Sequence, residues 1–403
     1  MTDTAPPMPM QGVRVLDCAT FIAGPCCATF LGEFGAEVIK IELPGTGCPL
    51  RKFGTMTETG DSLPWLSESR NKQSLTLDLR KPEGAQILKD LVSKSDVLVE
   101  NFQPGTLEGW GLGWDVLRAI NPRLVMVRIS AYGQTGPYSG RPGFGRIANA
   151  FGGISYLAGY PDRPPVTPGS ATLPDYLSGM FGAMGALMAL RTAETSGQGQ
   201  VVDIGLYESI FRLLDELAPA YAFKGYVRER MGPGTVNVVP HSHYPTKDGR
   251  WIAIACTNDK IFARFAEVAG APEVAGQGKW GTIAQREAAR AEVDQWVTDW
   301  TLQHDRDTIL QLCETGQVPC GPLLSIAEIF EDPQYAARGN IARVPHPVLG
   351  ELALPAVVPR LTATPGRIAS LGPTLGQNTE TILTALLGRT AAEVGALRAK
   401  GVI

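Results

Sequence analysis

A regular alternation of short apolar runs with helix-like segments is the feature that most limits what this chain can fold into. Strands are expected at residues 13–17 and 37–42, on either side of a helical apolar pattern at residues 26–34 that ends at Gly35. The alternation continues in five further segments, at residues 74–79, 82–95, 96–100, 114–120 and 124–129. This pattern predicts an α/β fold built on a doubly wound parallel sheet.

In a doubly wound sheet, ligands bind beyond the carboxyl ends of the strands. Four loops of this chain follow expected strands, at residues 20–25, 43–51, 101–105 and 130–142. We therefore expect these loops to surround one crevice.

The remainder of the chain predicts a smaller domain and a return to the first one. Residues 131–170 are rich in Gly and Pro and predict a functional loop with little regular structure. A long helix is expected at residues 176–194, and a change of character near residue 226 predicts a small α+β domain. The expected parts are the first portion of the large α/β domain, a linker, the small domain, and a segment that completes the large domain, at residues 1–206, 207–225, 226–325 and 326–403.

Composition excludes several functional classes. A formal net charge of −4 argues against a nucleic-acid partner, which requires a basic face. Seven cysteines without a C-x-x-C pair, together with four histidines, argue against a metal site and fit a reducing compartment. The N-terminus carries no secretory pattern, and no run reaches about 18 apolar residues, the length of a membrane span. We expect a cytoplasmic protein with no membrane partner.

One acid stands out, because Asp175 follows the Gly- and Pro-rich segment and opens a very apolar helix. An acid in the first turn of a helix is ordinarily explained by the helix dipole. No P-loop, nucleophile elbow or dinucleotide fingerprint appears in its required context. The residues alone therefore leave the role of Asp175 open.

The order of motifs resembles that of the family III CoA-transferases, a superfamily that includes formyl-CoA and carnitine CoA-transferases and the alpha-methylacyl-CoA racemases. The resemblance runs almost from end to end and rests on Asp175 and eight sequence blocks: VRVLD with AGP at 13–25, LGEFGAEVIKIE at 31–42, NKQSLTLDLRKPEG at 71–84, ENFQPG at 100–105, GQTGPY at 133–138, TSGQGQVVDIGLYE at 195–208, VPCGP at 318–322 and LGQNTE at 375–380.

The resemblance implies that Asp175 is the catalytic nucleophile, which is acylated and then carries CoA as a thioester. The CoA ester is a substrate, so no cofactor is expected. Charge developing on the carbonyl oxygens needs N–H donors, for which the backbone at Gly152 and Gly153 or the start of the Asp175 helix is a candidate. Two interlocked subunits, forming a homodimer, are also implied.

The resemblance further implies eight CoA-binding residues: Ile22, Ala23, Leu77, Leu79, Arg80, Asn101, Phe102 and Gln103. Alternatives remain for some of them, because Leu77 and Leu79 also fit a plain strand core, and Asn101 and Phe102 an ordinary turn. Arg51 and Lys72 are further candidates for phosphate contacts, although an exposed, solvated charge is the favoured interpretation of each.

Departures from the family pattern indicate which group of enzymes within the family the chain resembles most. Residues 236–249 lack the Gly-rich run of the formyl-CoA transferases, which also carry basic residues in place of Leu43 and Gly109. Racemases use a histidine where this chain has Phe144 and Gly145. The chain resembles most the transferases that use succinyl-CoA as donor and malate, citramalate or mesaconate as acceptor. A racemase and a non-catalytic CoA-ester-binding protein are the alternatives.

The second carboxylate of a dicarboxylate acceptor needs a cation when it is buried. The candidates are Arg146, Arg228, Arg230, His241 and His243. For the two histidines, a water-facing position on a hairpin edge is the favoured interpretation.

Overall fold

The computed structural model describes residues 7–403, and the chain divides into two compact units. The large unit consists of the described residues up to Ser155 together with two later segments, Thr167–Val227 and Ala337–Ile403. The small unit consists of Tyr156–Val166 and Arg228–Ala336. The chain therefore leaves the large unit and later returns to it.

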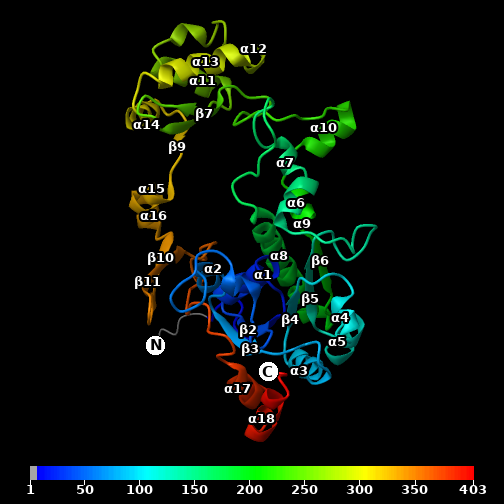
Figure 1. Ribbon diagram of the computed structural model, residues 1–403. Coiled ribbons are helices and arrows are strands. Elements are labelled where there is room, and N and C mark those ends of the chain that lie inside the picture. The colour runs from blue at the N-terminus through cyan, green and yellow to red at the C-terminus, as the bar shows by residue number, and fades with distance from the viewer. Residues whose placement is uncertain (1–6) are drawn as a thin grey trace. The chain divides into compact units, whose positions relative to one another are not determined.

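A six-stranded, all-parallel sheet forms the centre of the large unit (Figure 1). The strand order is β3-β2-β1-β4-β5-β6, with β1 Arg14–Asp17, β2 Glu37–Glu42, β3 Lys72–Thr76, β4 Val97–Glu100, β5 Val125–Ser130 and β6 Val201–Gly205. The order reverses between β1 and β4, as in a doubly wound sheet. The expected α/β class with a parallel sheet is confirmed.

Alternate side chains of each strand enter two different cores, because successive residues of a strand point to opposite faces. Val15 packs with helices α1 (Ala23–Glu33) and α8 (Leu173–Ser196). Leu16 packs in the other core with α3 (Pro82–Val92) and with residues near the C-terminus.

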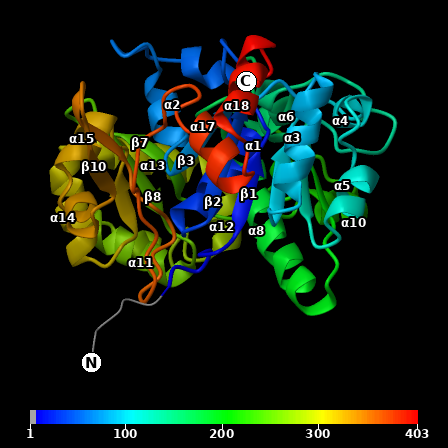
Figure 2. The same ribbon diagram turned by 90° about the horizontal axis from the view of Figure 1, so that it is seen from below.

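The C-terminal segment belongs to this second core. Helix α18 (Ala391–Ala399) lies beside α3, and ion pairs join Lys400 to Glu83 at 3.0 Å and Arg389 to Asp90 at 2.7 Å (Figure 2). Short elements complete the large unit: η1 Pro49–Lys52, α2 Leu63–Glu68, α4 Thr106–Gly109, α5 Trp114–Ile120, α6 Gly145–Phe151, α9 Leu206–Phe211, α10 Leu217–Lys224, β10 Ile341–His346, β11 Gly350–Pro355, α17 Thr379–Thr381 and η3 Ile382–Leu386.

The small unit combines an antiparallel sheet of order β7-β8-β9 with helices around an aromatic core. Phe262, Phe265 and Trp300 are central to this core. Its elements are β7 His241–Pro245, β8 Trp251–Ala255, α11 Asp259–Val268, η2 Pro272–Val274, α12 Ile283–Ala288, α13 Arg290–Thr301, α14 Arg306–Thr315, β9 Cys320–Pro322, α15 Ile326–Glu331 and α16 Pro333–Arg338. Helix α7 (Ile154–Leu157) spans the point where the chain passes between the units.

Two expectations about local structure are wrong. The strand expected at residues 74–79 is instead β3, Lys72–Thr76, so Leu77 and Leu79 lie beyond its end. The segment at residues 131–170, expected to have little regular structure, contains α6 and α7. Across residues 7–403, every helix is too short or too polar to cross a membrane.

Candidate active site

Asp175 is the third residue of α8, where the Pro174 ring occupies the preceding position and favours helix initiation. Its side chain is half-buried. Desolvation by burial raises the pKa of Asp175 to about 6, and a backbone hydrogen bond opposes this rise only in part. The carboxylate is therefore poorly solvated yet mostly ionised at neutral pH, which suits a nucleophile.

The start of α6 lies directly against this carboxylate. A Cβ atom built on Gly145 would stand 2.4 Å from Asp175 Oδ2 and 2.4 Å from the carbonyl oxygen of Ala171. Such distances are far inside van der Waals contact, so no side chain fits at Gly145 without displacing one of these groups.

Helix α8 also packs closely against α1, which brings the first strand-to-helix loop near Asp175. A Cβ atom at Gly179, one turn after Asp175, would stand 2.9 Å from the Ala23 carbonyl oxygen and 2.9 Å from Cys26 Cβ. The glycine thus permits backbone contact between the two helices. Ala23, one of the predicted CoA-binding residues, thus contacts α8 at a residue one helical turn after the candidate nucleophile.

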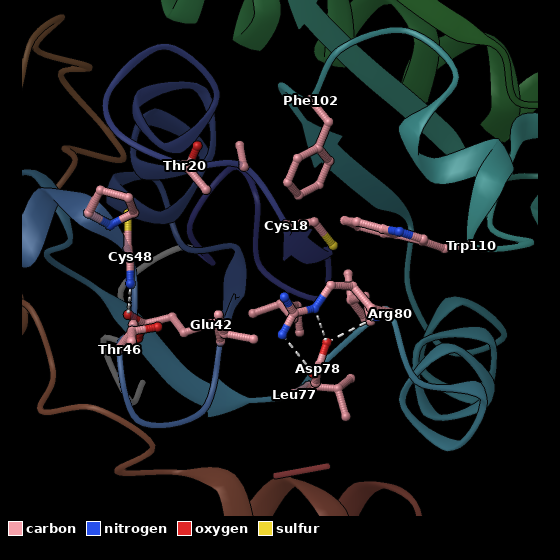
Figure 3. Close-up of a pocket in the computed structure, with 16 residues that line it drawn as sticks. Cys18, Thr20, Glu42, Thr46, Cys48, Leu77, Asp78, Arg80, Phe102 and Trp110 are labelled. Carbon is pink, nitrogen blue, oxygen red and sulfur yellow. Dashed lines mark hydrogen bonds and ion pairs between the residues drawn. The ribbon is translucent and has the colours of Figure 1, made fainter. Parts of the chain in front are cut away.

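A cavity of about 410 Å³ opens at the carboxyl ends of β1, β2 and β3, next to the reversal of strand order (Figure 3). Four predicted CoA-binding residues line it, namely Leu77, Leu79, Arg80 and Phe102. The remaining lining residues are Cys18, Ala19, Thr20, Ile41, Glu42, Leu43, Thr46, Gly47, Cys48, Pro49, Asp78 and Trp110. We call this the large cavity, to distinguish it from a smaller one beside Phe102.

Aromatic and charged groups stand at one side of the large cavity. The rings of Phe102 and Trp110 meet edge to face, with 5.3 Å between their centroids. Arg80 is held by Asp78 through two bonds, Nε to Oδ1 at 2.8 Å and Nη2 to Oδ2 at 2.9 Å, and both residues appear in Figure 3. The Arg80 side chain remains 58% exposed, so its guanidinium is accessible to an anion.

A second cavity, of about 120 Å³, shares Phe102 with the first. Asn101 and Gln103 line it, and it extends to Phe144, the neighbour of Gly145. Residues from all four loops line these cavities, as expected, but they line two separate cavities that share Phe102 rather than one crevice.

Ile22 and Ala23 line neither of these cavities. Ile22 is buried beside Cys48 and Trp65, and Ala23 is buried against α8. The loop that contains them is joined to Asn101 by two hydrogen bonds: Thr20 N donates to Asn101 Oδ1 at 2.7 Å, and Asn101 Nδ2 donates to Thr20 O at 2.8 Å. Asn101 thus fastens the loops after β1 and β4 to one another.

Arg51 and Lys72, expected to be exposed and solvated, are buried, so that interpretation is wrong. Arg51 is bound to Glu42 at 2.7 Å and lies over the Trp65 ring. Lys72 is bound to Asp17 at 2.8 Å. Both cations are thus engaged inside the protein, Arg51 by an acid nine residues earlier and Lys72 by one 55 residues earlier.

The suggested oxyanion donors at Gly152 and Gly153 are also not supported. The Gly152 N–H donates to Ala148 O at 2.8 Å, and the Gly153 N–H donates to Ala150 O at 3.3 Å. Both groups are therefore used within α6 and the turn that follows it.

The candidates for binding a distal carboxylate fall in both units. Arg146 belongs to the large unit and donates to Thr167 Oγ1 at 3.1 Å. Arg230, in the small unit, donates to Tyr156 O at 2.9 Å. His241 and His243 lie on β7, an edge strand, where His241 is half-buried and His243 is exposed.

The model of CoA-transferase family III matches residues 10–379. The chain belongs to this family. The family III chain is 52% identical to the beta subunit of succinyl-CoA–L-malate CoA-transferase from Chloroflexus aurantiacus, over 100% of both proteins. It is 51% identical to an alpha subunit of that name, over 98% of this chain and 93% of the relative.

Two further comparisons agree. The succinyl-CoA–D-citramalate CoA-transferase of Chloroflexus aurantiacus is 46% identical to the family III chain, over 100% of both proteins. The crystal structure of a CAIB/BAIF family protein from Brucella suis superimposes with a TM-score of 0.83 at 32% identity, covering 94% of this chain and 100% of that one. The resemblance inferred from the motifs is confirmed, and the chain is a CoA-transferase.

Proposed function

We propose that this enzyme transfers CoA from succinyl-CoA to a hydroxy-dicarboxylate such as malate or citramalate, with Asp175 as the nucleophile. The observation that carries the choice of substrates is the identity of 46–52% along the whole chain to transferases that bear these names. The racemase alternative has no comparable support, because the residues beside Asp175 are Phe144 and Gly145 rather than a histidine.

The reaction begins when an Asp175 oxygen attacks the thioester carbonyl. A mixed anhydride forms and CoA leaves as the thiolate, which then attacks the Asp175 carbonyl carbon and releases succinate. The acceptor carboxylate attacks the resulting aspartyl thioester, giving a second anhydride and the thiolate again. The thiolate takes the acyl group of the acceptor, and the Asp175 carboxylate is restored. No water and no redox partner enter the balance.

The environment of Asp175 supports this role. Water competes with the acceptor acid for both anhydrides and for the thioester, so a partly dry nucleophile favours transfer over hydrolysis. Burial, the same property, raises the pKa of Asp175 to about 6. The first turn of α8, the other suggested source of oxyanion donors, is not supported either, because Pro174 has no N–H and the N–H groups of Leu173 and Tyr176 donate to Ser170 O at 3.3 Å and to Thr172 O at 3.1 Å.

The large cavity suits the nucleotide part of CoA. Its walls are mainly apolar, and the edges of Phe102 and Trp110 offer surfaces for an aromatic ring. Arg80, exposed at this cavity, is suited to a phosphate. Asn101 and Gln103 line the second cavity, which extends from Phe102 to Phe144.

We also propose a homodimer. Helix α8 buries a face of small residues but exposes Met180, Met184, Leu187 and Met188 on its other side. Three of these four side chains line an apolar groove of about 490 Å³ together with Phe30 and Phe34. Exposed apolar surface of this kind is typical of an interface, and a second copy of the chain is the occupant that the family resemblance supports. The seven free cysteines suit a reducing cytoplasm.

The decisive experiment is a product analysis by mass spectrometry. Succinyl-CoA is incubated with malate, citramalate, mesaconate, itaconate, formate or oxalate, using wild type, Asp175→Ala and a control, Asp162→Ala, which removes an exposed acid. We expect a new CoA ester with wild type and the control only, and a hydroxylamine-sensitive acyl group on Asp175. Transfer by Asp175→Ala at the wild-type rate would contradict the proposed nucleophile.

The alternatives are separated by one added assay and by the same panel of acids. A racemase would exchange the alpha proton of a 2-methylacyl-CoA with deuterated water in the absence of any acceptor acid. A non-catalytic binding protein would bind succinyl-CoA and form no new ester with any acid.

A further inference from the structure

Three charged side chains form a cluster completely enclosed in the large unit. Asp17 ends β1, Lys40 lies on β2 and Lys72 begins β3, and the side chain of each is 0% exposed. Lys40 Nζ lies 3.1 Å from Asp17 Oδ1, and Lys72 Nζ lies 2.8 Å from Asp17 Oδ2. One carboxylate is therefore shared between two ammonium groups.

This arrangement contains one cation more than charge balance requires. A buried ammonium is costly unless it is paired, and one lysine would already satisfy the carboxylate. Burial would raise the pKa of Asp17, but the attraction of Lys40 and Lys72 outweighs it and holds that pKa below its usual value. Asp17 is thus ionised, and the extra lysine calls for an explanation other than pairing.

The remaining contacts of the two lysines supply that explanation. Lys40 Nζ also donates to the carbonyl oxygen of Ala19, and Lys72 Nζ donates to that of Pro25 at 2.7 Å. Asp17 Oδ1 accepts the Ala19 N–H at 3.1 Å. The cluster therefore holds both ends of the segment from Ala19 to Pro25, which we call the Ala19–Pro25 loop although its last three residues form the first turn of α1.

The loop held in this way is strained. Phe21, in its middle, has φ +58°, a left-handed conformation that bulky residues adopt only when their surroundings enforce it. Its ring meets those of Phe53 and Phe144 edge to face, with centroid distances of 6.2 Å in both cases. Phe144 precedes Gly145, the residue that touches Asp175.

We propose that Lys40 and Lys72 are positioning residues, which hold the Ala19–Pro25 loop in its strained form so that the enzyme binds CoA esters. The inference rests on the proposed function, since Ala19 and Thr20 of this loop line the large cavity, which we assign to CoA. Neither lysine contacts substrate. Each acts through a backbone carbonyl at one end of the loop.

Because two lysines share one carboxylate, either lysine can be replaced without leaving a buried charge unpaired. Lys40→Met or Lys72→Met leaves Asp17 paired with the other lysine, so no uncompensated charge remains in the core. Each variant loses the contact to one end of the loop. By contrast, Asp17→Asn would leave two unpaired buried cations, so it is unsuitable. Val394→Ala, a buried change on α18, is the matched control for lost stability alone.

Two measurements are made on each full-length variant. Hydrogen exchange of peptides covering residues 18–28 reports the loop, and steady-state kinetics gives KM separately for succinyl-CoA and for the acceptor acid. For both lysine variants we expect at least tenfold faster exchange in these peptides and about a tenfold higher KM for succinyl-CoA. The KM for the acid should stay within twofold, because no residue of this loop is a candidate for binding the acceptor.

The Val394→Ala control should lower thermal stability but change neither the exchange of the loop peptides nor the KM for succinyl-CoA. Lys40→Gln and Lys72→Gln keep a neutral donor and should restore part of the protection, and they serve as the test if the Met variants do not fold. Loop exchange and succinyl-CoA KM equal to those of the control would overturn the proposal. If wild type transfers CoA to no acid, the proposed function fails, whereas the exchange measurement still decides the role of the lysines in the loop.

Discussion

The carboxylate of Asp175 and the Cα atom of Gly145 lie so close together that a single added methyl group would stand 2.4 Å from Oδ2. The two residues come from the starts of different helices, α8 and α6. The position of the nucleophile is therefore set by the absence of a side chain thirty residues earlier in the chain.

Replacing Gly145 by alanine should move the Asp175 carboxylate. Because a displacement of about 1 Å can cost about 100-fold in rate, we expect kcat to fall by one to two orders of magnitude. Gly140→Ala, in the same loop, is the control, since a Cβ there meets nothing within 4 Å. Equal kcat values in the two folded variants would argue against this positioning role.

The rate should depend on pH through Asp175. Burial raises the pKa of this carboxyl to about 6, and only the ionised form attacks a thioester. We expect kcat/KM for succinyl-CoA to be level above about pH 7 and to fall tenfold per pH unit well below 6. A profile that stays level down to pH 5 would be inconsistent with this nucleophile.

The same carboxyl should lower stability at alkaline pH. Since its folded pKa lies above the unfolded value of 3.8, its stabilising contribution is present below about pH 4 and is lost as the pH rises through about 6. Asp175→Asn, which cannot ionise, should therefore have the higher free energy of unfolding at pH 8, by at most about 3 kcal/mol. Urea titrations at pH 8 and pH 3 check this, and the difference should nearly vanish at pH 3, below the unfolded pKa.

Much of the sheet could be predicted because its strands are short apolar runs separated by helix-stop signals. Glu37–Glu42 and Trp114–Ile120 have the predicted bounds, since each is bounded by a turn signal. The sequence places strand β3 two residues too late at its start and three too late at its end, because the alternating pattern continues through Leu77 and Leu79 after the backbone pairing has ended.

Charged residues were the part of the site that sequence could not place. Lys72 and Asp17 are 55 positions apart, and nothing local in either segment indicates that they meet. The role of Gly145 could likewise not be predicted, because it depends on the close approach of α6 to α8 in the folded protein. Lys40 is the one indication of the buried charge cluster in the sequence. It interrupts the apolar pattern of a predicted strand, where a lysine is buried only if it is paired.

Arg80 should contribute to binding rather than to chemistry. It lines the large cavity, which Asp175 does not line, so Arg80→Ala should raise the KM for succinyl-CoA several-fold and leave kcat nearly unchanged. Repeating the assay with the 3′-dephospho ester locates the contact, because the defect should disappear if Arg80 binds the 3′-phosphate. Arg398→Ala, a change at an exposed arginine on α18, should alter neither constant.

The exposed face of α8 should determine the oligomeric state. Leu187→Glu places a charge in the apolar groove, and we expect light scattering to report a shift from dimer to monomer. Arg191→Glu, one turn further along, alters a side chain that is 80% exposed and should leave the mass unchanged. A monomeric wild type would refute the homodimer.

The close contacts at Gly145 and Gly179 have a practical consequence for anyone who wishes to alter the acids that this enzyme accepts. At Gly179 even a methyl group would strike the main chain of the opposing helix, and at Gly145 it would strike the reactive carboxyl. Mutant libraries should leave both positions unchanged. Any side chain there would disrupt the active site, so the variant would be inactive whatever acid it might otherwise accept.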